Sequence, residues 1–344
     1  AGLSNKHQPL FNYFKQLFAQ VTNPPIDSLR EKIVTSTAVY IGTDGNILEE
    51  KAENCHMLRI NNPILTNTDL LKIKNMNNEG FKVAEIPITY YKNTSLEKAI
   101  ERMFMEADRA HSDGANILIL TDRGVDENHV AIPSLLAVSA MQQHLVVTKK
   151  RTSVAMILES GEPRTVHHFA ALLGYGACAI NPYLAQDTIK ELINIGLLDK
   201  DYYAAVDDYN KAVISGITKI AAKMGISTIQ SYQGSKIFEA IGFAPEVIEK
   251  YFTGTISNEK EGFLLLTIPD QDGWEVYVDG KKTETINGDY GFLAVKLTAG
   301  NHDIKAVYHI PYMKQGAVMS VFGVLLLVGY CLWLYRRDRK KKQG

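Results

Sequence analysis

The chain has 344 residues, of which 46% are hydrophobic and 22% are charged, and this composition excludes a disordered, collagen-like or wholly membrane-embedded protein. The length suits two or three domains with at least one sizeable core. The formal net charge is -1, but residues 336–344 hold six Lys or Arg and one Asp, so this tail carries +5 and the rest of the chain -6. The body therefore lacks the basic surface that nucleic acids require, and we expect no nucleic-acid partner.

The cysteines and the first residues bear on the compartment. Cys55, Cys178 and Cys331 are too widely spaced for a zinc motif and too few for a disulfide framework, which favours a reduced compartment for the first two. The chain starts with Ala-Gly-Leu-Ser and has no apolar targeting stretch there. We therefore expect a fragment or a processed chain without a secretory signal.

The first 95 residues predict an irregular mixture of helix and strand. Apolar residues recur at helical spacing from Phe11 to Val21, and this helix should end before the TNPP of residues 22–25, because paired prolines cannot continue it. Short strands are expected at Ala38–Ile41 and Ile47–Leu48.

From Ser95 onward, short apolar runs alternate with amphipathic helical stripes. This alternation predicts an α/β fold made of β/α units, with a buried parallel sheet that is either barrel-like or open. The expected helices span residues 96–107, 132–139, 166–173 and 209–224, and the expected strands span residues 116–120, 154–158, 177–180 and 226–229.

Polar residues follow the predicted strands. In a parallel sheet such residues meet at the carboxyl edge, where β/α proteins place their ligands. Asp, Asn and Ser also favour turns and helix caps for local reasons, so a structural role outweighs a functional one, and we assign no catalytic, cofactor-binding or metal-binding residue. The candidates for a ligand edge are Asp122, Arg123, Glu159, Asn181, Gln230 and Ser231.

Residues 258–312 change in character. Short apolar or alternating runs are separated here by turn residues, which predicts four antiparallel strands. The four runs are Phe263–Pro269, Trp274–Val278, Leu293–Leu297 and Ile304–Ile310. So small a sheet buries little surface, and it should need a neighbouring domain or a membrane for stability.

A transmembrane helix is predicted at residues 313–336. Gly316–Tyr335 has no charged residue and is long enough to cross the roughly 30 Å of a bilayer's hydrocarbon core. Tyr312, Trp333 and Tyr335 stand where interfacial aromatic residues belong, and the basic tail at 337–344 should face the cytoplasm. The segment before the helix would then lie outside the cell.

Long ungapped blocks of the first 257 residues resemble a known family. Three blocks are similar to the central domain of the large subunit of bacterial and plastid glutamate synthase. They are YFKQLFAQVTNPPIDSLRE (13–31), ESGEPRTVHHFAALLGYGACAINPYLA (159–185) and KMGISTIQSYQGSKIFEAIG (223–242). The resemblance covers about residues 8–257. One departure is Cys178, because the family usually has an acidic residue at this place.

The resemblance implies a role in glutamate biosynthesis. The parent enzyme makes two glutamates from glutamine and 2-oxoglutarate: a glutaminase domain releases ammonia, and a synthase domain with FMN and an iron–sulfur cluster consumes it. The central domain lies between these two partners and keeps them in register in the cytoplasm. By this resemblance, residues 1–257 are a connecting domain with no complete active site, and both cofactors belong to domains that this chain lacks. Whether the chain is an enzyme in its own right stays open.

The last 80 residues resemble a different family. They look like the extracytoplasmic end of YfhO-type bacterial membrane proteins. The resemblance is carried by GWEVYVDGKK (273–282), GFLAVKLTAGNHDIKAVY (291–308), the final apolar run and the basic tail. The two halves thus imply different compartments. We infer a joined chain, from gene fusion or from an assembly or reading error, with the seam near Ser257–Gly262.

Two alternatives remain for the function. Residues 95–250 could form a self-sufficient β/α enzyme that uses Asp122, Arg123, Glu159 and Asn181, which requires a deep convergent pocket at the sheet edge. Alternatively, the chain could be a membrane-tethered binding module whose single span only localises it.

Overall fold

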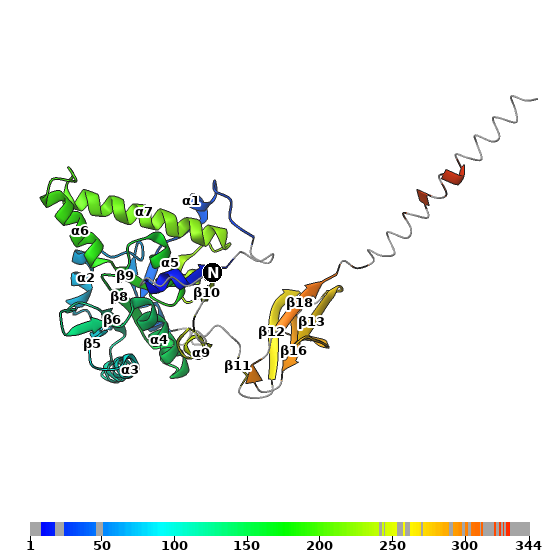
Figure 1. The fold of residues 1–344 in the computed structure, drawn as a ribbon, viewed down its shortest axis with the longest axis horizontal. Coiled ribbons are helices and arrows are strands. Elements are labelled where there is room, and N and C mark those ends of the chain that lie inside the picture. Colours follow the sequence, from blue (N-terminus) through cyan, green and yellow to red (C-terminus); the bar gives the residue numbers. More distant parts are fainter. Residues whose placement is uncertain are drawn as a thin grey trace, which may run out of the picture. The chain divides into compact units, whose positions relative to one another are not determined.

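The computed structural model describes residues 8–17, 24–45, 51–240, 243, 245–252, 257–258, 262–269, 271–288, 292–297, 300–301, 304–309, 311, 320, 323–324, 326 and 328–330. The chain divides into two compact units, Ala1–Gly254 (unit 1) and Thr255–Gly344 (unit 2), which are coloured from blue to yellow and from yellow to red in Figure 1.

A four-stranded parallel sheet forms the centre of unit 1. Its strands pair in the order β4 (Val83–Pro87), β6 (Ile117–Thr121), β8 (Ala155–Glu159) and β9 (Ala179–Asn181). Every residue of β6, β8 and β9 is buried, as expected for a parallel sheet that is covered on both faces. The predicted β/α fold is confirmed, and within the described residues the sheet is open, since β4 and β9 stand at opposite ends of the order.

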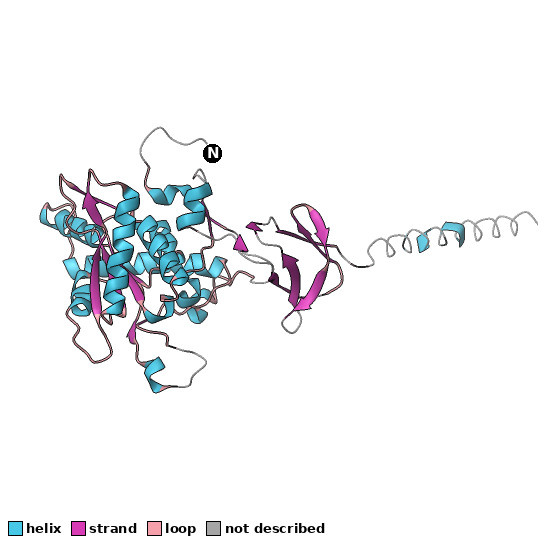
Figure 2. Ribbon diagram, turned by 90° about the horizontal axis from the view of Figure 1, so that it is seen from below, coloured by secondary structure: helices cyan, strands magenta, loops and turns pink. Residues whose placement is uncertain are grey.

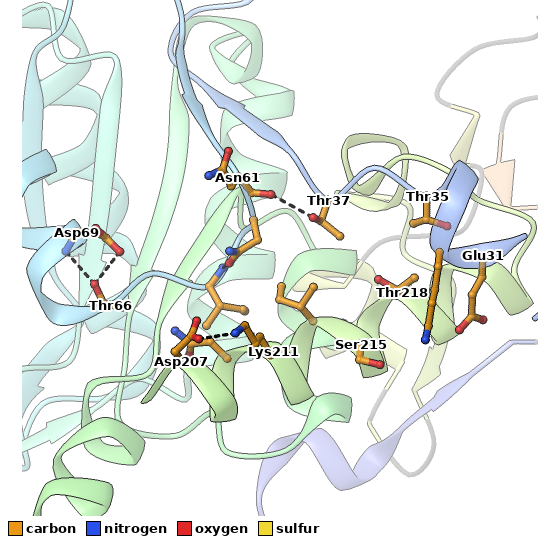
Figure 3. Close-up of a pocket in the computed structure, with 15 residues that line it drawn as sticks. Glu31, Thr35, Thr37, Asn61, Thr66, Asp69, Asp207, Lys211, Ser215 and Thr218 are labelled. Carbon is orange, nitrogen blue, oxygen red and sulfur yellow. Dashed lines mark hydrogen bonds and ion pairs between the residues drawn. The ribbon is translucent and has the colours of Figure 1, made fainter. Parts of the chain in front are cut away.

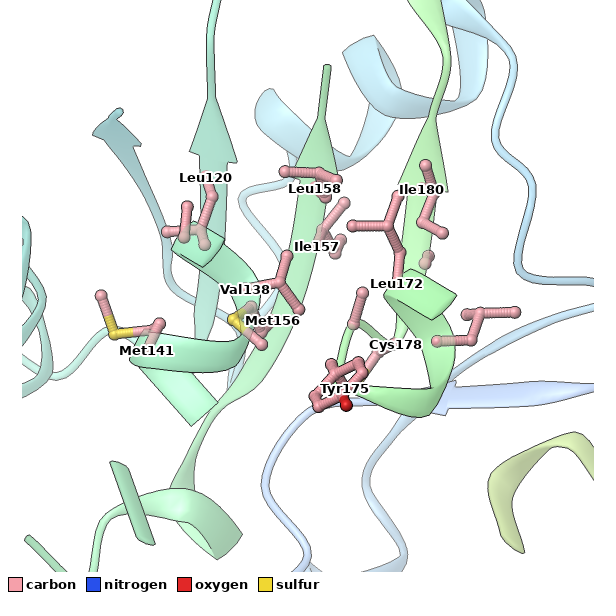
Figure 4. Close-up of a cluster of buried hydrophobic side chains, with 14 of the residues drawn as sticks. Leu120, Val138, Met141, Met156, Ile157, Leu158, Leu172, Tyr175, Cys178 and Ile180 are labelled. Atoms are coloured by element: carbon pink, nitrogen blue, oxygen red, sulfur yellow. The ribbon is translucent and has the colours of Figure 1, made fainter. Parts of the chain in front are cut away.

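Three crossover helices connect the four strands. They are α3 (Leu96–Ser112), α4 (Ser134–Val147) and α5 (Val166–Gly174). The hydroxyl of Ser95 caps α3 by accepting a hydrogen bond from the backbone N–H of Lys98, which satisfies one of the free donors at the helix start. Apolar side chains of α4 and α5 pack with those of β6, β8 and β9 in one continuous cluster, whose labelled members include Val138, Leu158 and Leu172 (Figure 4).

Further elements surround this centre (Figure 2). Short 3-10 helices occur at Leu10–Tyr13, Ala52–Cys55 and Arg151–Ser153. The remaining elements of unit 1 are β1 (Phe14–Gln16), α1 (Glu31–Val34), β2 (Val39–Ile41), β3 (Leu58–Ile60), α2 (Asn67–Lys74), β5 (Thr89–Tyr91), β7 (His129–Ala131), α6 (Tyr183–Asn194), α7 (Tyr202–Lys223), α8 (Ile229–Tyr232), β10 (Phe238–Ala240) and α9 (Pro245–Tyr251).

The predicted helix from Phe11 to Val21 is wrong over its described part. A 3-10 helix ends at Tyr13, and Phe14–Gln16 form β1, which pairs antiparallel with β10. Phe14 is fully buried against Tyr175 and Phe252. Long-range pairing and aromatic packing therefore override the local helical spacing, a common outcome because propensity is a weak preference. The strand expected at Ile47–Leu48 lies outside the described residues.

The predicted fourth strand at residues 226–229 is also wrong. Thr228 makes only an isolated parallel bridge to Ser36, and the following four residues form α8. The fourth strand of the sheet is instead β4, within the region expected to be irregular. Its sequence, VAEIP, was hard to recognise because it contains a charged residue and ends in proline, both of which are depleted in strands.

The strands of unit 2 that the structure describes pair antiparallel, as predicted, but they form two three-stranded sheets and one short pair instead of one sheet of four strands. One sheet has the order β12 (Gly262–Pro269), β16 (Phe292–Leu297), β15 (Thr285–Gly288), and the other has β14 (Lys281–Thr283), β13 (Trp274–Val278), β18 (Ile304–Tyr308). The two-residue strands β11 (Ser257–Asn258) and β17 (Gly300–Asn301) also pair. The small core of unit 2 is formed by Val276, Leu293, Val295 and Leu297.

Most of the predicted span at 313–336 lies outside the described residues, which include Ser320, Gly323, Val324, Leu326 and residues 328–330 in helical conformation. Over the part of the chain that the structure describes, no helix combines the length and the apolar character that a membrane crossing requires.

Candidate functional site

Four of the six sequence-predicted candidates lie at the carboxyl ends of neighbouring parallel strands. Glu159 and Asn181 are the last residues of β8 and β9, and Asp122 and Arg123 directly follow β6. The register pairs Thr121 with Glu159 and Glu159 with Asn181. The structure therefore brings these four residues together at one edge, as the parallel arrangement predicts.

Glu159 is the centre of a buried hydrogen-bond network. Its side chain is 3% exposed. One carboxylate oxygen accepts from the Lys74 Nζ at 2.8 Å and from the Thr121 hydroxyl at 2.7 Å, and the other accepts from the Arg123 Nε at 2.5 Å. Lys74 also donates to Glu85 at 2.6 Å. Two cations and a hydroxyl thus compensate one buried carboxylate, as buried charge requires.

The network sets the charge state of its members. Burial by itself would raise the pKa of the Glu159 carboxyl, but hydrogen bonds from Lys74, Arg123 and Thr121 outweigh burial and hold that pKa below its usual value. Burial would likewise lower the pKa of the Lys74 ammonium, yet the bonds to Glu159 and Glu85 leave it raised. Both groups are therefore ionised at neutral pH, and neither is poised as a general acid or base near pH 7.

Asp122 organises the turn that follows β8. It is 4% exposed, and its carboxylate accepts from the Ser160 hydroxyl at 2.6 Å and from the Gly161 backbone N–H at 3.0 Å. The guanidinium carbon of Arg123 lies 4.0 Å from the centre of the Tyr183 ring, a cation–π contact. Burial, together with a hydrogen bond to Asp122, raises the pKa of Tyr183. These contacts fix the loops at the sheet edge to one another.

Asn181 is fully buried, and its amide nitrogen donates to the Leu65 carbonyl and to the Asn67 side chain, each at 3.0 Å. Gln186 donates to the same Leu65 carbonyl at 2.9 Å and accepts from the Asn67 backbone N–H. Asn181 thus anchors the segment that leads into α2.

Gln230 and Ser231 do not follow a strand of the sheet. Both lie in α8, and the Ser231 hydroxyl is 2.7 Å from the Thr228 hydroxyl at the start of that helix. The prediction that they share the edge with Asp122 and Glu159 depended on the strand at 226–229, which does not form.

Sequence reasoning missed Lys74, Thr121 and Tyr183. Thr121 and Tyr183 flank predicted candidates, so the same strand-end rule could have found them. Lys74 belongs to α2, far from Glu159 in sequence, and no local signal identifies it. In the part of the chain that the structure describes, no group of three His, Cys, Asp or Glu side chains is placed to hold a metal ion.

A polar cleft with a volume of about 490 Å³ lies beside this edge, between α1, α2 and α7. Of the fifteen residues that line it, only Ile64 and Ile214 are apolar. Figure 3 shows Glu31 and Thr35 at one end, beside Ser215 and Thr218 of α7, and Thr66 and Asp69 at the other. No sequence pattern predicted this cleft, because its walls come from three distant segments.

Two protein families match the chain in succession. The model of the glutamate synthase central domain matches residues 1–244, and that of the bacterial membrane protein YfhO matches residues 244–320. Both matches include residue 244, where one ends and the other begins.

Curated relatives include the glutamate synthase [NADPH] large chain of Bacillus subtilis, which is 47% identical over 271 residues, covering 79% of this chain and 18% of the relative. The glutamate synthase [NADH] of Schizosaccharomyces pombe is 44% identical, covering 75% of this chain and 12% of the relative. Ferredoxin-dependent glutamate synthase 2 of Synechocystis is 37% identical, and the match covers 90% of this chain and 21% of the relative. The chain thus spans about a fifth or less of the length of these relatives.

Among solved structures, the inosine 5'-monophosphate dehydrogenase of Legionella pneumophila is similar, with 10% identity, a TM-score of 0.37, and coverage of 70% of this chain and all of that one. At so low a score, the fold assignment rests on the strand pairing alone.

Proposed function

Because this chain belongs to the glutamate synthase central domain family, we propose that residues 1–257 act as the connecting domain of a glutamate synthase, between a glutaminase domain and an FMN synthase domain. The observation that carries this proposal is the match over residues 1–244, together with 47% identity to a relative of which this chain spans 18%. The function would therefore be exerted as part of a larger enzyme.

The carboxyl edge of the sheet supports a structural role. Glu159 is held by three donors, and Asp122 is held by Ser160, Gly161 and Tyr183, all within the domain. Asn181 donates twice, and its own side-chain oxygen has no partner among the residues that the structure describes. The same edge is where a self-sufficient β/α enzyme would need side chains directed at a substrate. Side chains that bind one another make the edge rigid, and a rigid connector can keep two catalytic domains at a fixed separation.

The cofactors of the parent enzyme are assigned to its other domains. An iron–sulfur cluster is held by several cysteine thiolates, whereas this chain has three cysteines, of which Cys55 is exposed and Cys178 is buried beside Arg151. These residues do not fit a cluster. FMN is placed in the synthase domain by the family resemblance.

For the second half, we propose a membrane anchor. The match to a bacterial membrane protein family over 244–320 and the uncharged run at Gly316–Tyr335 support a helix at 313–336 with a cytoplasmic tail at 337–344. The antiparallel module at 258–312 would lie on the opposite side. A joined chain accounts for two families in one polypeptide: the two family matches meet at residue 244, and the sequence resemblance places the seam near Ser257–Gly262.

A domain exchange tests the connector. Residues 1–244 would replace the matching central domain of the Bacillus subtilis large chain, and glutamate synthesis would be measured with glutamine or with ammonium as the nitrogen donor. We expect glutamine-dependent activity within about tenfold of the parent enzyme. The control exchange inserts a Gly/Ser linker of the same number of residues, which should lose glutamine-dependent synthesis while keeping part of the ammonium-dependent reaction.

If the exchanged enzyme folds, uses ammonium and couples glutamine no better than the linker control, the connector role is wrong.

Peptide mapping addresses the seam independently, because a native peptide crossing residues 251–274 must exist if the joined chain is made in the cell.

A further inference from the structure

The polar cleft between α1 and α7 contains buried acceptors that the protein itself leaves unpaired. Asn210 of α7 is 8% exposed, and its side-chain oxygen has no hydrogen-bond partner. The hydroxyl of Thr35, after α1, is likewise buried without a partner. A buried polar atom without a hydrogen-bond partner is unfavourable. Because Asn210 and Thr35 both line the cleft, these atoms indicate a place where a ligand donates hydrogen bonds.

One anion and one cation of the cleft are also without an ion pair in the described part of the chain. Glu31 is 9% exposed, and Lys32 follows it on α1. The other charges are already engaged: Lys211 pairs with Asp207 at 2.6 Å, and Asp69 accepts from the Thr66 hydroxyl at 2.6 Å. The free charges are therefore adjacent, one buried and the other exposed.

We propose that this cleft binds a free α-amino acid with a neutral polar side chain. Its ammonium group would donate to the Glu31 carboxylate and the Thr35 hydroxyl. Its carboxylate would face the Lys32 ammonium. Both side chains line the cleft, so a ligand with one positive and one negative group matches the charges that it meets there.

The rest of the cleft suits a polar side chain. From Asp207 to Thr218, α7 extends for about 16 Å along the cleft, and Asn210 and Ser215 lie on this stretch. A hydroxyl or carboxamide of the ligand would donate to the Asn210 oxygen. The volume of about 490 Å³ is within the usual range for small-molecule sites, about 300–1,000 Å³. This inference does not depend on the connector function.

Calorimetric titration of the full chain, kept soluble in a mild detergent, tests the proposal with L-asparagine as the probe. We expect saturable binding with a Kd between about 10 μM and 1 mM. N-acetyl-L-asparagine lacks the ammonium and asparagine amide lacks the carboxylate. The acetylated analogue should bind at least about tenfold more weakly, because it loses a charge-assisted hydrogen bond to the buried Glu31. Asparagine amide should bind about threefold more weakly, because the partner of the carboxylate, Lys32, is exposed. L-Leucine should also bind more weakly, because it leaves Asn210 unpaired.

Substitutions locate the site. Glu31→Gln and Asn210→Leu should weaken L-asparagine binding by about tenfold or more, and Lys32→Ala by about threefold, since this lysine is exposed. Lys32→Ala cannot disturb the core, so it keeps the test valid if a buried variant fails to fold. The matched control is Asp207→Asn, which lies in the same cleft but is already paired with Lys211, and it should change the Kd by less than about threefold.

Absence of binding up to about 10 mM L-asparagine would overturn the proposal. Equal affinity for the acetylated or amidated analogue would overturn it as well, because recognition would then not use the two charges. A loss in Asp207→Asn as large as in Glu31→Gln would show that the ligand lies elsewhere.

Discussion

Units 1 and 2 use the same kinds of apolar residue in very different ways. In unit 1, strands such as β6 and β8 are buried along their whole length and lie in one large cluster with α4 and α5. In unit 2, two three-stranded sheets enclose a core of Val276, Leu293, Val295 and Leu297. Since hydrophobic stabilisation grows with buried apolar area, unit 1 should hold most of the stability of the chain.

The two units also differ in how they treat charge. Unit 1 buries Glu159 and Asp122 at its sheet edge and compensates them with specific donors. In unit 2 the ion pair of Lys282 with Glu275 is exposed on its lysine side. A buried network costs much to break, whereas a surface pair contributes little. The following predictions sharpen this contrast.

The largest effect is expected from a cavity in the sheet of unit 1. Ile157 of β8 is fully buried, so Ile157→Ala should destabilise unit 1 by about 2–5 kcal/mol. Thermal unfolding is followed with two probes. Tryptophan fluorescence reports on unit 2, which contains both Trp274 and Trp333, and far-UV circular dichroism reports mainly on the helices of unit 1. The matched variant Val276→Ala should lower the unit 2 transition alone, and a shift of both transitions by either variant would mean that the units do not unfold separately.

Next in size is the removal of the buried charge. Glu159→Gln keeps the shape but removes the anion that Arg123 contacts and leaves Lys74 with Glu85 alone, and we expect a loss of about 2–4 kcal/mol in urea unfolding. The matched control is Glu85→Gln, which removes the half-exposed partner of the same lysine and should cost about 0–1 kcal/mol. Equal losses in both variants would contradict a special role for Glu159.

The same network predicts the pH dependence of unit 1. The pKa of Glu159 is lowered in the folded state, so its contribution is complete above the usual glutamate value of 4.5 and disappears as the pH falls through the lower, folded pKa. The pKa of Lys74 is raised, so its contribution is complete below 10.5 and disappears as the pH rises through the higher, folded pKa. Unfolding followed from pH 2 to 7 should show a smaller acid loss in Glu159→Gln than in the unsubstituted chain.

A smaller effect concerns the contact of α5 with α7. A Cβ at Gly216 would stand 2.5 Å from one methyl group of Val166 and 2.6 Å from the other. Gly216→Ala should therefore destabilise unit 1 by about 1–2 kcal/mol, since overpacking exceeds the gain in helix propensity. The double variant with Val166→Ala should lose less than the sum of the two single variants. Strict additivity would show that the two residues do not press on one another.

The smallest effect is expected at a buried tyrosine. The Tyr232 hydroxyl is buried without a partner, whereas the Tyr209 hydroxyl donates to the Arg164 carbonyl at 3.1 Å. Tyr232→Phe should leave stability unchanged or raise it by up to about 1 kcal/mol, and Tyr209→Phe should lower it by about 0.5–1.5 kcal/mol. Denaturant midpoints compare the pair, and a larger loss for Tyr232→Phe would reveal a partner for that hydroxyl.

Local sequence was sufficient for elements whose pattern agrees with their environment. The strands β6 and β8 were recognisable because burial on both faces requires a continuous apolar run. Helix α3 was recognisable because burial of one face requires apolar residues at helical spacing. It was insufficient for Phe14, which pairs across the chain with Ala240, and for Thr228, which makes one isolated bridge. Those backbones follow partners that are distant in sequence.

The candidate site shows the same limit. Asp122, Arg123, Glu159 and Asn181 could be grouped because every parallel strand ends at the same edge. Their actual partners, such as Lys74 and Leu65, come from segments with no strand-end signal. The domain limits at 257 and 312 remain predictions.

The order of residues by itself determined the family of the first 244 residues, the alternation of helix and strand after Ser95, and the change of character before the final apolar run. Tertiary structure alone decided which cation meets Glu159, which strand completes the sheet, and where Glu31 and Asn210 enclose a cleft. The physical reason is that periodicity records how deeply a residue is buried, while the identity of its neighbour depends on how distant segments pack together.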